Sequence, residues 1–147
     1  MHQIEGEAQK LENLAHKIKS WGASFGFQQV SIVEPDLTEA SERLHEWLAK
    51  GFQGSMNWMA AHGDKRYVVN KLVDHTVRVI SVRMDYLADT NMIAVLKDDN
   101  KAYISRYALG RDYHKIIRKR LAALIKKIEE EIPELNLTQR PFVDSAP

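Results

Sequence analysis

Apolar positions recur along this chain at helical or strand spacing, and they predict most of its elements. In residues 7–22 the apolar side chains return every three or four positions, which predicts an amphipathic helix. Residues 27–33 alternate and are rich in β-branched side chains, so we expect a strand there. A second helix is expected over residues 38–50, with Thr38 as a candidate cap.

The middle of the chain contains shorter patterns. A glycine turn at 51–54 precedes a short apolar helix, in which Met56, Trp58 and Met59 are interpreted as core residues, and one or two helical turns are expected at 65–73. Residues 77–86 give the strongest strand signal, which predicts a central strand. The alternation in 102–107 predicts another strand, whereas 92–96 is compatible with helix or strand.

The last third is dominated by one apolar stripe over residues 113–131, which predicts the longest helix, ended by Pro133. Residues 141–143 should be an extended piece that leads to Asp144. The predicted fold class is therefore α+β, with helices flanking a small central β-sheet that includes 77–84 and 102–107, and with the long helix packed on one face. No repeat or linker interrupts the 147 residues, so a single domain is expected.

Composition narrows the classes of function. With 44% apolar and 28% charged residues the chain can bury a core, and its net charge of +1 gives no overall field that favours nucleic acid. A run of about eighteen apolar residues and a signal peptide are both missing, so we expect a cytoplasmic protein. Without cysteine, these residues can form neither a disulfide nor a thiolate-held metal or iron-sulfur site. The six histidines show no paired metal-ligand spacing, so no metal site is predicted.

Two long motifs near the end carry a resemblance. They read YISRYALGRDYHK at 103–115 and RPFVDSAP at 140–147, and together they resemble the paired signatures of the epoxyqueuosine reductases. Upstream, GFQGSMNWM at 51–59 and VISVRMDYL at 79–87 are also similar to segments of that family. The resemblance covers roughly residues 51–147. It departs from the family at 72–75, where LVDH replaces the usual Pro-Gly turn.

The resemblance implies an oxidoreductase of queuosine biosynthesis, active in tRNA processing. Such an enzyme reduces epoxyqueuosine to queuosine at the wobble position of the tRNA anticodon, with cobalamin as the reactive cofactor. Electrons come from an electron donor protein through 4Fe-4S clusters, which cysteines hold in a downstream ferredoxin-like domain. We therefore expect residues 1–147 to be the N-terminal cobalamin-binding and catalytic domain, truncated before the iron-sulfur domain, inactive alone and able to self-associate.

Asp144 is the candidate catalytic residue. Removal of an epoxide oxygen requires a proton for the departing alkoxide, which a positioned carboxylic acid can donate. The neighbours of Asp144 in the sequence are apolar, and apolar surroundings would favour its protonated form. The resemblance assigns Asp144 the same role. Alternatively, an aspartate followed by serine is only a turn residue or a helix cap.

The candidate cofactor-binding residues surround Gly110, at a predicted junction between strand and helix. Backbone N–H groups at a helix start can bind an anionic or amide-rich ligand, such as the corrin side chains or the modified nucleoside. In the alternative reading Asp112 only caps the helix, Tyr107 is an aromatic at the edge of the core, and His114 faces solvent. The candidates are Arg106, Tyr107, Asp112, Tyr113, His114 and, from the last motif, Ser145.

A basic stripe on the predicted long helix is the candidate substrate-binding surface. Its candidate residues for contacts with tRNA phosphates are Arg111, Lys115, Arg118 and Lys119. A run of charges on a helix is also typical of a solvated face, and three glutamates follow at 129–131. Two other functions stay open, namely a non-catalytic domain that binds RNA or a protein partner, and a related corrinoid-dependent reductase with another substrate.

Overall fold

The computed structural model describes residues 2–87, 89–135 and 137–144. Its elements, in chain order, are α1 (His2–Ser24), β1 (Gln29–Val33), α2 (Thr38–Ala49), α3 (Trp58–Ala61), the 3-10 helices η1 (Gly63–Arg66) and η2 (Val69–Lys71), β2 (Val79–Arg83), α4 (Met92–Leu96), η3 (Arg106–Ala108), α5 (Tyr113–Glu131) and η4 (Pro133–Leu135). These helices and the sheet confirm the predicted α+β class. Among the described residues, no helix is both long and apolar enough to cross a membrane.

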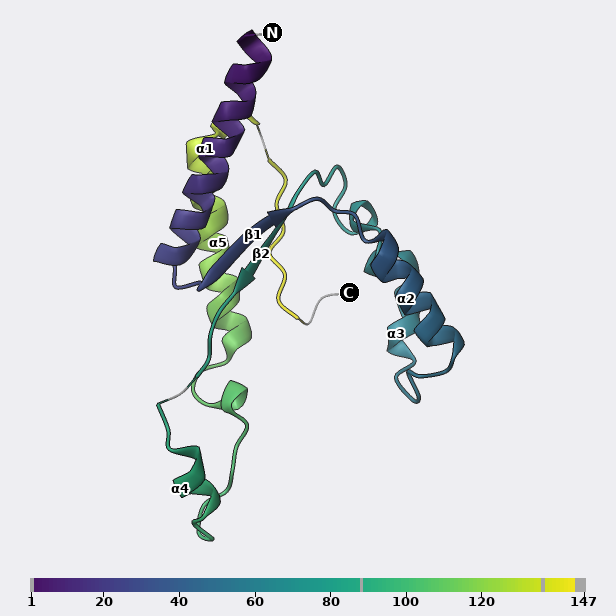
Figure 1. Ribbon diagram of the computed structural model, residues 1–147, viewed down its shortest axis with the longest axis vertical. Coiled ribbons are helices and arrows are strands. Elements are labelled where there is room, and N and C mark those ends of the chain that lie inside the picture. Colours follow the sequence, from purple (N-terminus) through teal and green to yellow (C-terminus); the bar gives the residue numbers. More distant parts are fainter. Residues whose placement is uncertain (1, 88, 136, 145–147) are drawn as a thin grey trace. The chain divides into compact units, whose positions relative to one another are not determined.

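The chain folds as two compact units. The first comprises the described residues of Met1–Val30, Val82–Leu137 and Pro141–Asp144, and the second comprises Ser31–Ser81 with Thr138–Arg140. The strands β1 and β2 pair with opposite directions in a two-stranded sheet (Figure 1). The main-chain N–H of Gln28 donates to the carbonyl of Arg83 at 2.9 Å, next to the paired strands.

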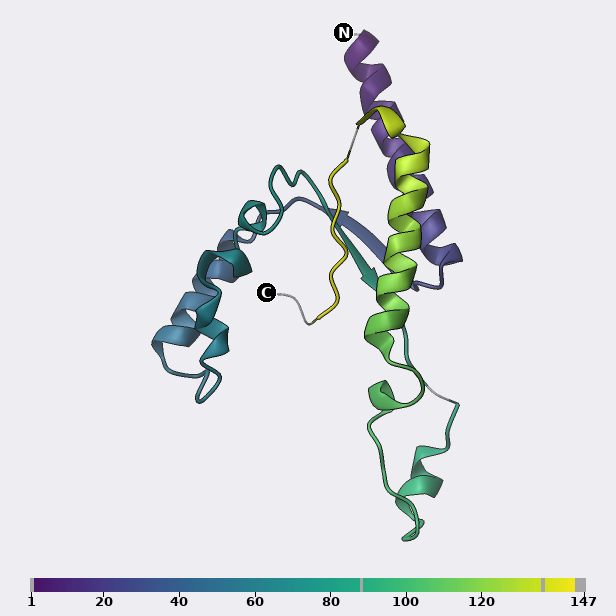
Figure 2. The same cartoon turned by 180° about the vertical axis from the view of Figure 1, so that it is seen from behind.

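In the first unit, α1 packs against α5, and the two helices lie side by side in both views (Figures 1 and 2). The buried apolar side chains among the described residues are Ile18 of α1, Phe27, and Leu124 and Ile128 of α5. Each such burial contributes about 1.5–3 kcal/mol. The same helix pair is joined at its surface by Lys17 and Glu131, whose charged atoms lie 2.5 Å apart.

Arg120 fixes α5 to the segment that follows α1. Its Nη1 donates to the carbonyl of Gly26 at 3.0 Å and lies 3.1 Å from the sulfur of Met84. Gly26 has φ +84°, and a Cβ atom at this position would lie 2.7 Å from Nη1 of Arg120. The backbone conformation therefore favours glycine, and a side chain at this position would also displace the end of Arg120 from its hydrogen bond.

In the second unit, α2 and α3 lie side by side (Figures 1 and 2). Thr38 is the first residue of α2 and not its cap; the N-cap is Leu37, which makes no side-chain capping bond. Before the helix, Oδ1 of Asp36 accepts the main-chain N–H of Thr38 at 3.0 Å. Asp64 accepts a hydrogen bond from the Tyr67 hydroxyl at 2.6 Å and is ion-paired with Lys71. These polar contacts join η1 to η2.

Two strand predictions were wrong. Residues 102–107 form no strand; their end lies instead in η3, and Tyr103, Ile104 and Tyr107 are exposed. An alternating pattern makes a strand only when a neighbouring strand supplies its hydrogen bonds, and none does here within the described residues. For the same reason β2 is one of two edge strands and not the centre of a larger sheet.

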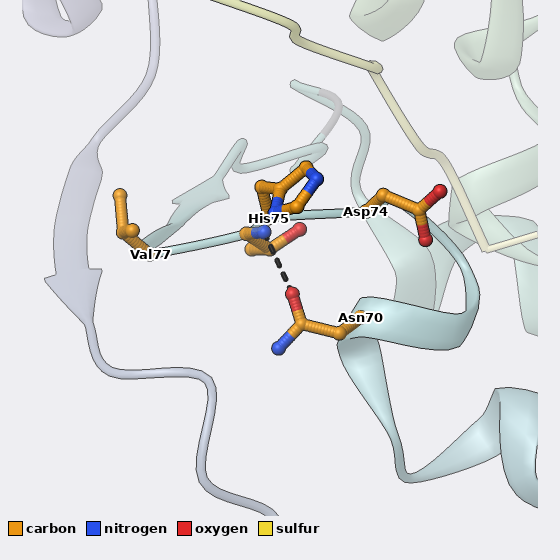
Figure 3. A pocket seen from close by; sticks show the side chains of 5 residues that line it. Asn70, Asp74, His75 and Val77 are labelled. Atoms are coloured by element: carbon orange, nitrogen blue, oxygen red, sulfur yellow. Dashed lines mark hydrogen bonds between the residues drawn. The ribbon is translucent and has the colours of Figure 1, made fainter.

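His75 lies in a turn with φ +59°, where side-chain-bearing residues are uncommon. The turn is closed by Asn70, whose Oδ1 accepts the main-chain N–H of Thr76 at 2.7 Å (Figure 3). The Thr76 hydroxyl donates to the carbonyl of Val73 at 2.6 Å. This backbone conformation favours glycine, so His75 holds it at some cost in strain.

We expect Leu124→Ala to lower the free energy of unfolding by about 2–5 kcal/mol, because Leu124 is only 2% exposed and the deletion leaves a cavity. The matched control is Leu11→Ala on α1, where the side chain is 62% exposed and a change below about 0.5 kcal/mol is expected. Urea denaturation followed by circular dichroism measures both. Equal effects of the two substitutions would contradict the assigned core.

We also expect His75→Gly to be more stable than His75→Ala by about 1 kcal/mol, because glycine has no Cβ to strain the left-handed backbone. Urea denaturation followed by the fluorescence of Trp47 and Trp58, which lie in the same unit, measures the difference. A glycine variant less stable than the alanine variant would show that residue 75 does not hold this conformation.

Candidate functional site

Asp144, the predicted acid, lies against the first turn of α5. The Tyr113 hydroxyl donates to Oδ2 of Asp144 at 2.5 Å. The other carboxylate oxygen, Oδ1, lies 2.9 Å from Nε2 of His114. Each oxygen of Asp144 therefore has a partner that can donate a proton, so the direction of the carboxylate is fixed.

His114 lies between two carboxylates. Its Nδ1 is 3.0 Å from Oδ1 of Asp112, while its Nε2 faces Asp144. The same oxygen of Asp112 accepts the main-chain N–H of His114 at 3.0 Å, as an N-cap does. The hydrogen bonds from His114, and the nearby charge of Lys115, hold the pKa of Asp112 below its usual value. Asp112 is thus both the helix cap and the second contact of the imidazole.

The aromatic rings hold this arrangement in place. Tyr113 stacks on the His114 ring with 4.1 Å between centroids and 25° between planes. Tyr107 meets Tyr113 edge-on, with 6.2 Å between centroids. Such contacts are worth about 0.5–1.5 kcal/mol beyond the area they bury. In the alternative reading His114 only faces solvent; its ring contacts Tyr113 and two carboxylates, and its side chain is 35% exposed.

Asp144 is more exposed to solvent than the apolar residues next to it in the sequence led us to expect. Its side chain is 59% exposed, and the groups that contact it are polar. The carboxylate is therefore accessible from solvent, while its two hydrogen-bonding partners fix its orientation. Exposure of this kind suits a group that exchanges protons with a bound molecule and with water.

The bond to Asp144 has an electrostatic consequence for its partner. Ionised Tyr113 would place a second negative charge beside the carboxylate. The hydrogen bond to Asp144, with smaller contributions from desolvation and nearby charge, raises the pKa of Tyr113 to about 12. Tyr113 therefore stays protonated at neutral pH and remains a hydrogen-bond donor. Since the folded pKa is above the unfolded one, the stability from this bond is present below about pH 10 and is lost as the pH rises towards 12.

The other predicted site residues within the described chain lie in η3, just before α5, or in the first half of α5. Arg106 is half-buried in η3, which begins the stretch leading to α5. The four predicted RNA-binding cations are exposed, and their three helical members share one face of α5 because they are three and four residues apart. These cations are Arg111, Lys115, Arg118 and Lys119. Ser145, the last predicted cofactor ligand, lies outside the described residues.

The surroundings fit a large flat ring with polar substituents. Tyr103, Ile104, Tyr107 and Leu109 expose apolar surface immediately before α5. The polar atoms of Asp112 and Tyr113 follow at the start of the helix, where they can meet amide groups. Within the described part of the chain, no group of three or more His, Cys, Asp or Glu residues could hold a metal ion. This chemistry is compatible with a corrin, whose metal is held by its own macrocycle.

The sequence alone did not reveal the hydrogen bond between Tyr113 and Asp144. They lie 31 residues apart, and no spacing rule connects them. The available signal was local: an aspartate two residues before a histidine at a helix start predicts the cap contact between Asp112 and His114. A hollow lined by residues 70 and 74–77 (Figure 3) contains none of the predicted site residues.

We expect Asp144→Asn to lower the pKa of Tyr113 from about 12 towards the usual value near 10, because the neighbouring negative charge is removed. Ultraviolet titration of the five tyrosines measures this as one phenol that ionises at lower pH. Asp98→Asn is the control, since the carboxylate of Asp98 is paired with Lys101. Superimposable curves for wild type and Asp144→Asn would exclude the bond.

Known proteins are similar to this chain over the residues that form the candidate site. The family described as "Epoxyqueuosine reductase QueG, DUF1730" matches residues 66–145. Curated epoxyqueuosine reductases are similar over most of the chain: that of Shigella dysenteriae is 51% identical over 138 residues, which is 93% of this chain and 36% of the relative. That of Pseudomonas aeruginosa is 54% identical over 135 residues, or 91% of this chain and 37% of the relative.

The Escherichia coli epoxyqueuosine reductase is 51% identical over 138 residues, again 93% of this chain and 36% of the relative. The chain thus spans little more than a third of the length of these curated relatives. No solved structure matches it. Asp112, Tyr113, His114 and Asp144 all lie within the family match, and by that match the chain belongs to the epoxyqueuosine reductase QueG family.

Proposed function

We propose that this chain is the cobalamin-binding and proton-donating part of a cytoplasmic epoxyqueuosine reductase. The reaction would convert epoxyqueuosine to queuosine at the wobble position of a tRNA anticodon. One observation carries the proposal: the exposed carboxylate of Asp144 is held by Tyr113 and His114 inside the family-matched segment. The fold class alone would not support it, because function depends on the site.

The balanced reaction explains why a held carboxyl group is needed. An epoxide takes up two electrons and two protons, and it yields an alkene and water. The oxygen leaves readily only when it is protonated, and a positioned acid typically contributes about 10²–10⁴-fold to such a step. Protonated Asp144 would donate to this oxygen. His114 Nε2, at 2.9 Å, would then return a proton to the carboxylate, while Asp112 holds the opposite side of the imidazole.

Cobalamin would lie against the exposed apolar surface before α5. The residues that would hold it are Arg106, Tyr107, Asp112, Tyr113, His114 and Ser145. When bound, the reduced corrin cobalt supplies an electron-rich centre for the epoxide carbon. The chain's own part is to orient this ring by aromatic contact, to bind its amides, and to keep Tyr113 protonated as a donor.

Electrons and substrate would come from outside these residues. Because the chain has no cysteine, the 4Fe-4S clusters of the reaction would be held by other residues than these, and an electron donor protein would reduce them. The exposed cations Arg111, Lys115, Arg118 and Lys119 would contact tRNA phosphates. Without those further parts, we expect the chain to be inactive and prone to self-association through its exposed apolar residues.

Titration with cobalamin, followed by visible absorbance and calorimetry, tests the proposal. We expect saturable binding that Tyr107→Ala weakens about threefold to tenfold through loss of an aromatic contact. Leu11→Ala, exposed on α1, serves as the control and should bind as the wild type does. Asp144→Asn should retain cobalamin, yet it should slow epoxide reduction about 10²–10⁴-fold in a full-length family member.

Two results would contradict the proposal. An absence of saturable binding by the wild-type chain would remove the cofactor role from these residues. Unchanged reduction by Asp144→Asn, measured by mass spectrometry as the loss of one oxygen atom from the nucleoside, would remove the acid role.

A further inference from the structure

The glycine turn of the second unit presents large apolar side chains to solvent. Phe52 is 63% exposed and Trp58 56% exposed, and Met56 between them is also exposed. Met56 and Trp58 had been interpreted as core residues, which was wrong. We call Phe52, Met56 and Trp58 the stacking loop.

The stacking loop is held in one conformation by its own backbone. Gly51 and Gly54 adopt φ values of +68° and +55°, which glycine reaches without strain. The main-chain N–H of Phe52 donates to the carbonyl of Trp47 at 3.2 Å, and that of Met56 donates to the carbonyl of Gln53 at 2.9 Å. A preformed loop loses little conformational entropy when a ligand binds.

The surface around the glycines is open. A Cβ atom at Gly51 or Gly54 would meet no other atom within 4 Å. The described chain therefore leaves both glycines uncovered, and the neighbouring rings of Phe52 and Trp58 are exposed.

A cation is already placed on the tryptophan. The guanidinium carbon of Arg66 lies 5.3 Å from the centroid of the Trp58 ring, and its Nη2 donates to the Trp58 carbonyl at 3.0 Å. The hydrogen bond fixes the guanidinium beside the ring, where it adds positive charge to an aromatic surface. More than half of the Trp58 side chain remains exposed in spite of this contact.

The segment that carries the stacking loop is itself basic, although α2 beside it carries Glu39, Glu42 and Glu46. Residues 50–71 contain four cations, Lys50, Lys65, Arg66 and Lys71, and a single carboxylate, Asp64. That carboxylate is already paired with Lys71 and with the hydroxyl of Tyr67. Lys50 and Lys65 are exposed on either side of the stacking loop in sequence. Protein-binding surfaces are depleted in lysine, whereas aromatic rings beside cations are typical of surfaces that bind single-stranded nucleic acid.

We propose that the stacking loop binds unpaired RNA bases, with Phe52 and Trp58 stacking on the bases and Lys50, Lys65 and Arg66 contacting the phosphates. This inference rests on the proposed function, because a tRNA substrate would supply the unpaired bases in its anticodon loop. It adds a second RNA contact that is independent of the cations of α5. Stacking tolerates any base, so the loop contributes affinity for single strands and not recognition of one nucleoside.

Fluorescence anisotropy with end-labelled RNA tests the inference. The probes are a single-stranded oligouridine and a fully paired RNA duplex of equal length. We expect Trp58→Ala and Phe52→Ala each to weaken binding of the single strand roughly five- to hundredfold, the range found for removal of one stacking ring, with little effect on the duplex. Trp58→Phe should retain most of the affinity because it keeps a ring. For single-strand binding, the logarithm of the binding constant falls linearly with the logarithm of the salt concentration. Lys65→Ala should make this slope shallower by about 0.7, the value for one phosphate contact.

Tyr86→Ala is the matched control, because Tyr86 is an equally exposed aromatic in the other unit. Circular dichroism confirms that each variant is folded. Single-strand binding by Trp58→Ala and Phe52→Ala equal to that of the wild type, or no binding by any variant, would overturn the inference. So would a change in self-association without a change in RNA binding, measured by sedimentation, since the loop would then be a protein contact.

The cobalamin titration separates the two proposals. Trp58→Ala is expected to bind cobalamin as the wild type does. If the wild type binds cobalamin and RNA binding depends on Arg118 and Lys119 but not on Trp58, only the present inference fails. If RNA binding depends on Trp58 but the wild type does not bind cobalamin, the inference about the stacking loop is supported. The cobalamin-binding part of the proposed function is then contradicted.

Discussion

The packing of α5 against α1 is the contact on which the first unit depends. It buries Leu124 and Ile128 of α5 with Ile18 of α1, and these residues are most of the apolar core among the described residues. Arg120 adds a polar link to the carbonyl of Gly26. Because α5 is held from Arg120 to Glu131 and is one continuous helix, these contacts also set the direction of its first turn. The site at that turn is thus positioned by a core that lies further along the same helix.

The sequence predicted helices well because their evidence is local. The stripe of apolar residues placed α5 at its observed bounds, since each helical hydrogen bond joins residues four apart. Strands were harder to predict, because a strand exists only with a partner that lies far along the chain. Residues 102–107 have the alternating pattern but pair with no strand within the described residues, which removed the larger sheet that had been expected.

The candidate site also contains one contact that is local in the sequence and one that is not. The cap contact of Asp112 with His114 spans two residues and could be read from the sequence. The bond between Tyr113 and Asp144 depends on how the extended end of the chain returns to α5, which no local pattern specifies. Exposure was also misjudged: the chain neighbours of Asp144 suggested burial, although burial depends on tertiary packing. Trp58 shows the opposite case of an apolar side chain left in solvent.

Asp112 Oδ1 accepts the main-chain N–H of His114 and also lies 3.0 Å from its ring nitrogen. Fraying of the first turn of α5 would therefore disconnect the imidazole from Asp112 in the same motion that opens the helix end. The lifetime of the capped turn then limits how long the row of contacts from Asp112 through His114 to Asp144 stays intact. Helix ends open on a far shorter timescale than whole domains unfold, so these contacts would be broken and formed again many times during the life of one folded molecule.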